Sequence, residues 1–330
     1  MVKYFDEDGW REGQISSCRK TISLIENHIQ SALLDMRDDF DGTKDRYINV
    51  LLEAKEKIHL EIIELVKAGE IDIDFDVYSD TPKGKDPDSF SPTLRNYHYI
   101  LWSKCLPNGK YFLLDLDTPR LLHHKFESGE YFLSSDAITH GYSNVKKMAH
   151  IIEQIKPEEV QEFDKICSTI GGYIIFPAKR IDNKMTINGA RGCNHKIQDR
   201  FDLTLECIRR FYKHQPSPLT EVLVRYSQFF NLFVDFKGYI EFFLLQDLVT
   251  EDCSEVLFWH SFDEFAGAAL PKNVKEYLDY KDNVINFVQR RNQRIRHSLL
   301  KRAGTFISSH YRWVQVWLCL RSSTAKSRLE

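Results

Sequence analysis

The sequence has no closely spaced cysteines and no long apolar run. Its seven cysteines include no CxxC pair, and no two of them lie within 12 residues of each other. We therefore expect no disulfide framework, but free and mostly buried thiols in a reducing compartment. No stretch approaches about 18 consecutive apolar residues, and the first thirty residues lack the apolar core of a secretion signal. These absences predict a cytoplasmic protein with no membrane partner.

The sequence also has no internal repeat, no low-complexity tract and no metal-binding pattern. Its 12 histidines are dispersed, without HxH, HxxxH or cysteine pairing, so no zinc site is expected. Asp199, Asp202 and Glu206 follow one another at steps of three and four, as carboxylates that bind a divalent cation would. The alternative is intrahelical pairing of Glu206 with Arg209 and Arg210. We predict no metal site, and the residues do not identify a cofactor.

Strong overall charge is absent as well, but the charge is unevenly distributed. Lys and Arg number 45 and Asp and Glu 48, for a net charge of −3, which excludes a globally cationic nucleic-acid coat protein. Residues 1–76 contain 18 acids and 10 bases, a net of −8, whereas residues 281–330 contain 11 bases and 2 acids, a net of +9. This asymmetry indicates either docking between the two ends or contact of the C-terminal part with a polyanion.

Three regions are expected from the hydrophobic pattern. In residues 1–70, apolar residues at helical spacing predict a helical hairpin, whose apolar stripe would pack on the core or form a homo-oligomer. Residues 71–270 mix short strand and helix patterns without regular alternation, which favours an α+β core over a doubly wound sheet. Residues 271–330 are expected to form basic helices.

Within the core, four local patterns predict particular elements. IDIDFDVY at 71–78 alternates apolar and acidic residues and predicts a strand, and the buried run GGYIIF at 171–176 predicts another. The PNG sequence at 107–109 favours a hairpin turn. Residues 199–212 predict a helix with one apolar seam, whereas GYIEFFLLQDLV at 238–249 is compatible with either a buried helix or a buried strand.

Several strings resemble a bacterial family of unknown function. They are RIDNKMTINGARG followed by IQDRFDLTLECIRRFY, then GYIEFFLLQDLVTED, together with SDTPKGKDPDSFSPTLRNYH, LWSKCLPNG, FLSSD and MAHIIEQI. The resemblance covers residues 74–292 and carries no implied chemistry, substrate or cofactor. The N-terminal hairpin and the last thirty residues are expected to be additions to the family core.

Two segments of the core combine residues that suit a nucleotide. LRNYHYILWSK at 94–104 places Arg95, His98 and Lys104 beside Trp102; cations neutralise phosphate, histidine transfers protons and aromatic rings stack on bases. The alternative is a half-buried segment with core aromatics and solvated cations. In the segment NGARG, which is expected between a strand and a helix, Asn188, Arg191 and the glycine N–H groups could hold an anion, or form a structural turn with a buried arginine.

Glu241 and Asp247 are acids embedded in apolar runs. A buried carboxylate has a raised pKa, so Glu241 is a candidate general base that would act with His98 as the second catalytic residue. Structural pairing with an arginine is the alternative.

The basic segment RRNQRIRH suggests a nucleic-acid contact through Arg290, Arg291, Arg294 and His297. The arginine-to-histidine spacing also resembles the motif of the higher-eukaryote-and-prokaryote nucleotide-binding ribonucleases. A solvated arginine-rich helix face is the alternative.

The leading hypothesis from the sequence is an intracellular bacterial enzyme acting on a nucleotide or a nucleic acid such as RNA, which would include a toxin or phage-defence role. It requires Arg95, His98, Arg191 and Glu241 to converge in one cleft. The rival hypothesis is a noncatalytic nucleic-acid or protein-binding module that uses the basic helices and the hairpin.

Overall fold

The computed structural model describes residues 7–34, 42, 46–55, 58, 69, 71–126 and 129–299. It divides into two compact units, one of residues 72–295 and one of residues 1–71 with 296–330. The larger unit also includes residues 271–295, which the sequence analysis placed in the C-terminal region. The helix expected near 306–320 lies outside the described residues. Within the described part of the chain, no helix is long and apolar enough to cross a membrane.

The smaller unit contains two N-terminal helices, as predicted. Helix α1 (Glu7–Leu34) and a second helix over residues 46–55 pack through a cluster that includes Cys18, Ile22 and Leu51. Cys18, Ile22 and Ile25 recur at three- and four-residue steps and therefore share one face of α1. The apolar stripe recognised in the sequence is the buried face of this helix pair.

The larger unit is built on antiparallel strands. Strands β3 (Leu122–Phe126), β4 (Gly129–Ala137) and β5 (Tyr173–Pro177) form one sheet in the order β3-β4-β5. β1 (Lys104–Cys105) and β2 (Tyr111–Phe112) form a separate hairpin around the PNG turn. The predicted α+β class, the buried strand GGYIIF and the PNG hairpin are thus confirmed.

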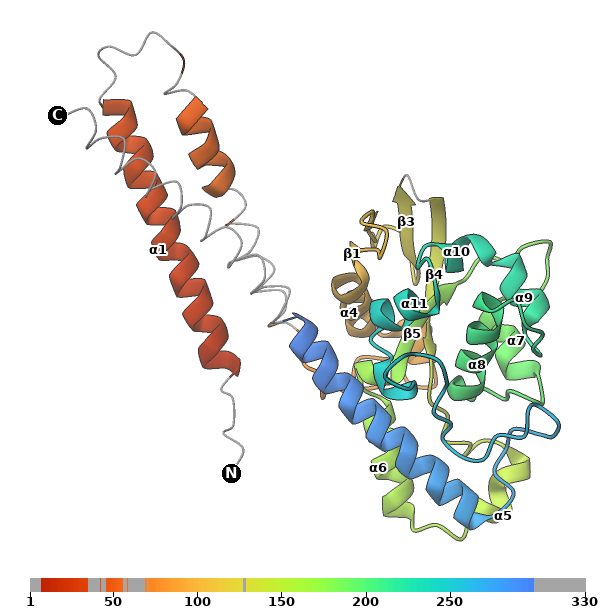
Figure 1. The fold of residues 1–330 in the computed structure, drawn as a ribbon. Coiled ribbons are helices and arrows are strands. Elements are labelled where there is room, and N and C mark those ends of the chain that lie inside the picture. The colour runs from red at the N-terminus through yellow and green to blue at the C-terminus, as the bar shows by residue number, and fades with distance from the viewer. Residues whose placement is uncertain are drawn as a thin grey trace. The chain divides into compact units, whose positions relative to one another are not determined.

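Helices surround the sheet (Figure 1). Helix α4 begins with Pro92 at its first position, and the Ser91 hydroxyl caps it by accepting a hydrogen bond from the Leu94 N–H at 3.1 Å. The helices of this unit are α3 (Pro87–Phe90), α4 (Pro92–Trp102), α5 (Ala149–Ile152), α6 (Pro157–Cys167), α7 (Ile187–Cys193), α8 (Phe201–Tyr212), α9 (Thr220–Arg225), α10 (Ser227–Asn231), α11 (Phe236–Phe243) and a long helix over residues 274–299.

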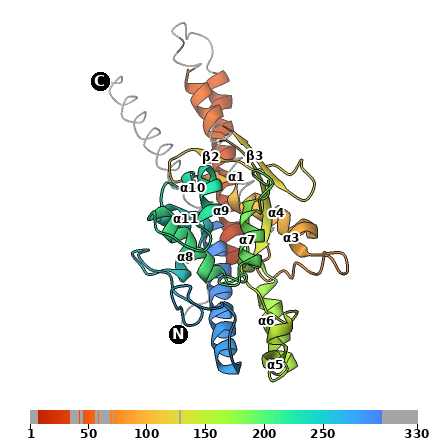
Figure 2. The ribbon, with the colours of Figure 1, turned by 90° about the vertical axis from the view of Figure 1, so that its right-hand side faces the viewer.

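The two faces of strand β4 contact different helices. Neighbouring residues in a strand point to opposite faces, so Ser135 and Asp136 lie on opposite sides of the sheet. Ser135 bonds to α4, whereas Asp136 bonds to Arg191 of α7. Figures 1 and 2 show α4 and the pair α7 and α8 on the two sides of the sheet. One pair of adjacent residues therefore belongs to two different environments.

On the α4 side, the core is an aromatic cluster. The Trp102 ring lies 6.0 Å from the Phe242 ring and 5.2 Å from the Phe243 ring, measured between centroids. The segment GYIEFF, for which helix and strand were both open, forms helix α11. Helix formation places Tyr239, Phe242 and Phe243 together on a face that packs against Trp102.

Three local expectations were wrong. Residues 71–78 form turns and not a strand, because the Asp72 and Asp76 carboxylates accept hydrogen bonds from N–H groups two residues later and so compete with strand pairing. The NGARG segment is not a loop but lies in helix α7, which the Thr186 hydroxyl caps. The cysteines are not mostly buried: of the six in the described part, only Cys18 and Cys207 are.

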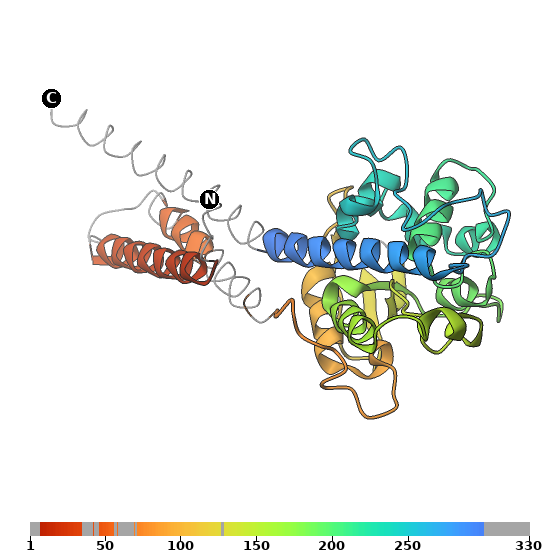
Figure 3. The same cartoon turned by 90° about the horizontal axis from the view of Figure 1, so that it is seen from below.

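The helix over residues 274–299 runs along the larger unit, as Figure 3 shows from below. Its buried residues Tyr277, Tyr280, Val284 and Phe287 recur at three- and four-residue steps. Although the helix is basic, this apolar seam holds it against the core.

Candidate functional site

His98, a predicted catalytic residue, lies wholly inside the core. It is 0% exposed, its Nδ1 accepts a hydrogen bond from Trp102 Nε1 at 2.9 Å, and its Nε2 lies 2.9 Å from Ser135 Oγ. Because the indole can only donate, the ring proton is on Nε2 and points to the hydroxyl. Burial, and secondarily the charge of Arg291, lowers the pKa of His98 to about 3. His98 is therefore a neutral structural histidine.

The neutral His98 predicts a pH dependence of stability. Its pKa in the folded state lies below the value of about 6.5 expected in the unfolded chain, so unfolding takes up a proton as the pH falls below 6.5. We expect His98 to reduce the free energy of unfolding by about 2 kcal/mol between pH 6.5 and pH 5. Urea unfolding at several pH values would measure this loss.

The control is a pair of glutamine substitutions. His98→Gln should flatten the dependence between pH 6.5 and pH 5, whereas His150→Gln, at an exposed position, should leave it as in the parent chain. An unchanged slope in His98→Gln would contradict the assignment of a neutral buried ring.

The predicted substrate-binding residues of the same segment bind the protein itself. Arg95 donates hydrogen bonds to the carbonyl oxygens of Leu116, Thr118 and Leu121 and so holds that loop. Trp102 is fully buried. The Lys104 ammonium donates to the Phe242 carbonyl and lies 4.4 Å from the centroid of the Phe242 ring. The buried tryptophan matches the alternative interpretation, in which the aromatic residues of the segment belong to the core. The cations, however, bind backbone carbonyl groups and are not simply solvated.

Glu241, the second predicted catalytic residue, is exposed. Its side chain is 56% accessible and lies 3.9 Å from Lys237 one turn earlier on α11. The expectation of a buried carboxylate was wrong because the apolar run forms a helix, and a helix turns one residue in three or four towards solvent. Arg95, His98, Arg191 and Glu241 do not share a cleft.

The predicted nucleic-acid contacts on the long helix divide into two kinds. Arg290 and His297 are exposed. Arg291 is fully buried and donates to the carbonyl oxygens of Gly171, Tyr173 and Phe243, and Arg294 forms a bidentate pair with Asp247 at 3.0 Å. Arg291 and Arg294 thus hold the helix on the core, and the prediction of a cationic face formed by all four residues was wrong.

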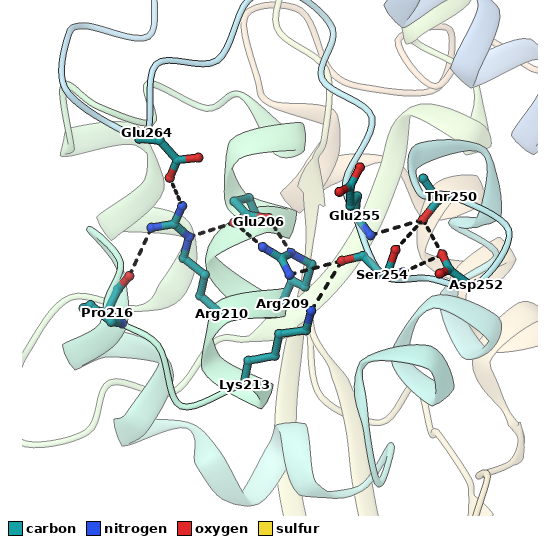
Figure 4. Close-up of polar contacts among 10 residues, drawn as sticks. All are labelled: Glu206, Arg209, Arg210, Lys213, Pro216, Thr250, Asp252, Ser254, Glu255 and Glu264. Carbon is teal, nitrogen blue, oxygen red and sulfur yellow. Dashed lines mark hydrogen bonds and ion pairs between the residues drawn. The ribbon is translucent and has the colours of Figure 1, made fainter.

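The carboxylates of α8 that were candidates for binding a divalent cation form ion pairs with arginines of the protein. Figure 4 shows the Glu206 carboxylate between Arg209 and Arg210, with N–O distances of 2.7 Å to both, and Arg210 also reaching Glu264. Asp202 is paired with Arg200. Within the described residues, no group of three or more His, Cys, Asp or Glu side chains has the geometry to hold a metal ion.

The structure contains a different polar site, a cavity of about 940 Å³ with many carboxylates, which we call the acidic cavity. It lies between helix α3, the end of strand β4, the segment 139–144 and helix α6. Asn188 of the NGARG segment lines the cavity. Arg191 of the same segment is bound to the lining residue Asp136. Its acidic lining residues are Asp76, Asp86, Asp88, Asp136, Asp164 and Asp199.

Asp136 and Arg191 form a buried ion pair at the base of the acidic cavity. Arg191 Nη1 donates to Asp136 Oδ2, and the same guanidinium donates to the Thr204 hydroxyl at 3.1 Å and to the Asp199 carbonyl at 3.0 Å. Burial raises the pKa of Asp136 to about 6, although Arg191 acts in the opposite direction. Asp136 is therefore mostly ionised at neutral pH and fixed in orientation.

Asp88, from the short helix α3, is the second carboxyl group of the site. Its Oδ2 accepts a hydrogen bond from the Ala137 N–H at 3.3 Å, whereas its Oδ1 is buried without a partner in the described structure. Burial raises the pKa of Asp88 well above its ordinary value, and the nearby Asp136 raises it further. These surroundings favour the protonated form of Asp88.

His140 also lines the acidic cavity as a neutral ring. Its Nδ1 accepts a hydrogen bond from the Tyr142 N–H at 2.9 Å, so its proton is on Nε2. Burial lowers the pKa of His140, and Asp199 partly offsets this. The cavity thus combines the arginine-paired carboxylate of Asp136, the Asp88 carboxyl with its raised pKa and a neutral imidazole.

Sequence reasoning missed Asp88, Asp136 and His140 as functional residues. The two aspartates lie in the segments KDPDSF and FLSSD, but nothing in the sequence distinguishes them from the other acidic residues. The available signal was an acid directly after the apolar strand FLSS, next to a segment rich in turn residues. Of the predicted set, only Asn188 and Arg191 belong to this site.

The fold and the site define an α+β protein with a carboxylate-rich cavity beside its three-stranded sheet. A model of a family of unknown function, DUF6994, matches residues 71–295, and the chain belongs to this family. This confirms the resemblance found in the sequence over residues 74–292. No curated protein and no solved structure matches the chain.

Proposed function

We propose that the protein is an acid–base enzyme that cleaves the glycosidic bond of a nucleotide-type substrate in the acidic cavity. The observation that supports this proposal is a pair of carboxyl groups in one cavity with different surroundings. Asp136 is paired with Arg191, whereas Asp88 has a buried oxygen without a partner in the described structure and a pKa raised well above its ordinary value. Environments that push two pKa values apart distinguish an acid from a base in many enzymes. Glycosidic cleavage needs both groups.

In the proposed reaction, the bond between the anomeric carbon and the leaving nitrogen or oxygen breaks. The leaving atom takes the proton of Asp88, and a water molecule adds to the anomeric carbon and gives its proton to Asp136. Arg191 keeps Asp136 ionised and oriented until that step. Proton exchange with solvent then restores both carboxyl groups.

The lining of the acidic cavity supports the sugar as the group held deepest. Carboxylates accept hydrogen bonds from sugar hydroxyls but repel phosphates. Lys85 and Lys165 also line the cavity and could meet a phosphate, and the Tyr78 ring, 55% exposed, offers a stacking face. A nucleotide with its ribose inside and its phosphate at the lysines fits this distribution of charge.

The test is a defined substrate panel. The purified chain is incubated with ATP, AMP, adenosine and a short RNA, and mass spectrometry measures release of the free base. Release by the parent chain and by Asp279→Asn, an exposed control, but not by Asp88→Asn or Asp136→Asn, is the expected result. Release by Asp88→Asn at the parent rate would contradict the proposal, and so would an Asp88 carboxyl that titrates near pH 4 by NMR.

A further inference from the structure

A second cavity, of about 1270 Å³, lies on the other side of helix α7, and we call it the basic cavity. α7 exposes two faces: Asn188 and Arg191, three residues apart, belong to the acidic cavity, whereas Ala190 and Cys193, also three apart, line the basic cavity. Helix α9 forms the opposite wall through Val222 and neighbouring residues. The seven-residue helix α7 therefore separates two sites of different charge.

The cations of the basic cavity are mostly unpaired. Its charged lining residues are Lys184, Lys196, Arg210, Arg225, Glu221 and Glu264. Arg210 is neutralised by Glu206 and Glu264. Among the residues that the structure describes, no carboxylate lies within ion-pair distance of Lys184, Lys196 or Arg225, so the three face Glu221 alone.

Arg225 is placed for an anion by contacts that leave its charge uncompensated. Its Nη2 donates to the Met185 carbonyl at 2.8 Å, which holds the 181–185 turn against α9, while its Nε is buried without an acceptor in the described structure. A guanidinium without a carboxylate partner gains from an incoming oxyanion, because charge-assisted hydrogen bonds are roughly twice as strong as neutral ones.

The cationic surface extends beyond the cavity wall. Lys179 and Arg180 are exposed, and the Tyr226 hydroxyl fixes this segment by donating to the Lys179 carbonyl at 2.8 Å. Burial raises the pKa of Tyr226, and Arg225 and Arg180 oppose that shift, so both guanidiniums lie near its ring. The unpaired positive charge thus spans the 179–184 segment, Lys196 and the end of α9.

We propose that the basic cavity binds phosphate groups of a nucleotide or of a single-stranded nucleic acid. Three unpaired cations around one concave surface match several phosphates better than a single carboxylate, and the cavity is wide enough for a nucleotide. This site is separate from the acidic cavity and does not depend on its chemistry. The sequence predicted a nucleic-acid contact on the long helix, but Arg291 and Arg294 of that helix are bound internally. The proposal places the contact at α7 and α9 instead.

The test compares two double charge reversals of equal size. Fluorescence anisotropy of a labelled single-stranded RNA 10-mer is measured from 50 to 200 mM salt for the parent chain, for Lys184→Glu with Lys196→Glu, and for Lys146→Glu with Lys147→Glu. All four lysines lie in the described surface, and Lys146 and Lys147 are exposed outside both cavities. We expect the first pair to weaken binding by at least tenfold and to reduce the salt slope by about 2, and the second pair to change little.

Competition distinguishes the two sources of phosphate. Displacement of the RNA by AMP or inorganic phosphate at millimolar concentration assigns the site to small phosphate ligands, whereas displacement only by unlabelled RNA assigns it to a strand. Equal weakening by both double variants, or no salt-dependent binding of RNA, AMP or phosphate, would overturn the proposal. Thermal unfolding of each variant checks that the substitutions leave the fold intact.

Discussion

Asp88→Asn is expected to lower kcat/KM of the proposed glycosidic cleavage by about 10²- to 10⁴-fold, the range typical of losing a general acid. The asparagine amide has the shape of a protonated carboxyl and can still accept the hydrogen bond from the Ala137 N–H. It cannot release a proton to a leaving group. We therefore expect the variant to keep the fold, with the main effect in the rate.

The pH profile of the parent enzyme provides the measurement. Activity needs Asp136 ionised and Asp88 protonated, so kcat/KM should fall below about pH 6 and fall again above the raised pKa of Asp88. Asp88→Asn should abolish the high-pH limb, and Asp136→Asn the low-pH limb. A parent profile that is flat from pH 5 to pH 9 would refute these roles.

Arg191→Met is expected to destabilise the fold by about 3–5 kcal/mol at pH 7.5, because it leaves the Asp136 carboxylate buried without its counter-ion. The pKa of Asp136 is already raised in the folded state, and removal of Arg191 raises it further. A raised acid pKa means that the folded state binds the proton more tightly. The stability loss should therefore be smaller at pH 5, where Asp136 is protonated, and larger as the pH rises.

A double-mutant cycle measures how much of this stability loss comes from the charge of Asp136. In the background Asp136→Asn, where no buried carboxylate remains, Arg191→Met should cost less and its cost should not depend on pH between 5 and 7.5. Urea unfolding of the four chains measures the coupling. Equal costs of Arg191→Met in both backgrounds would show that the arginine acts through its bonds to Thr204 and the Asp199 carbonyl and not through Asp136.

Local patterns anticipated most of the elements. The three-and-four spacing of Ile22, Ile25 and Ile29 predicted α1, and the apolar run GGYIIF predicted β5. Such patterns work because helices and strands repeat their side-chain directions at fixed periods. The prediction at 71–78 failed because aspartate side chains bond to the backbone there, a competition that alternation does not reveal.

The residues of the candidate site could be predicted from the sequence much less well than the helices and strands. His98 and Trp102 looked like a nucleotide pocket because of their residue types, but their hydrogen bonds connect them to each other and to Ser135. Glu241 looked buried because its neighbours are apolar, yet the helix turns it outwards. Residue type indicates the available chemistry, whereas burial and partners decide whether a ligand can use it.

The amino-acid sequence by itself determined the α+β class, the N-terminal helix pair, the PNG hairpin and the membership of the family core. Only the tertiary structure decided which polar residues meet. Asp88 and Asp136 are 48 residues apart and come from a helix and a strand, and Arg191 joins them from a third element. Their protonation states arise from burial and from one another's charges, which are properties of long-range packing and not of any local segment.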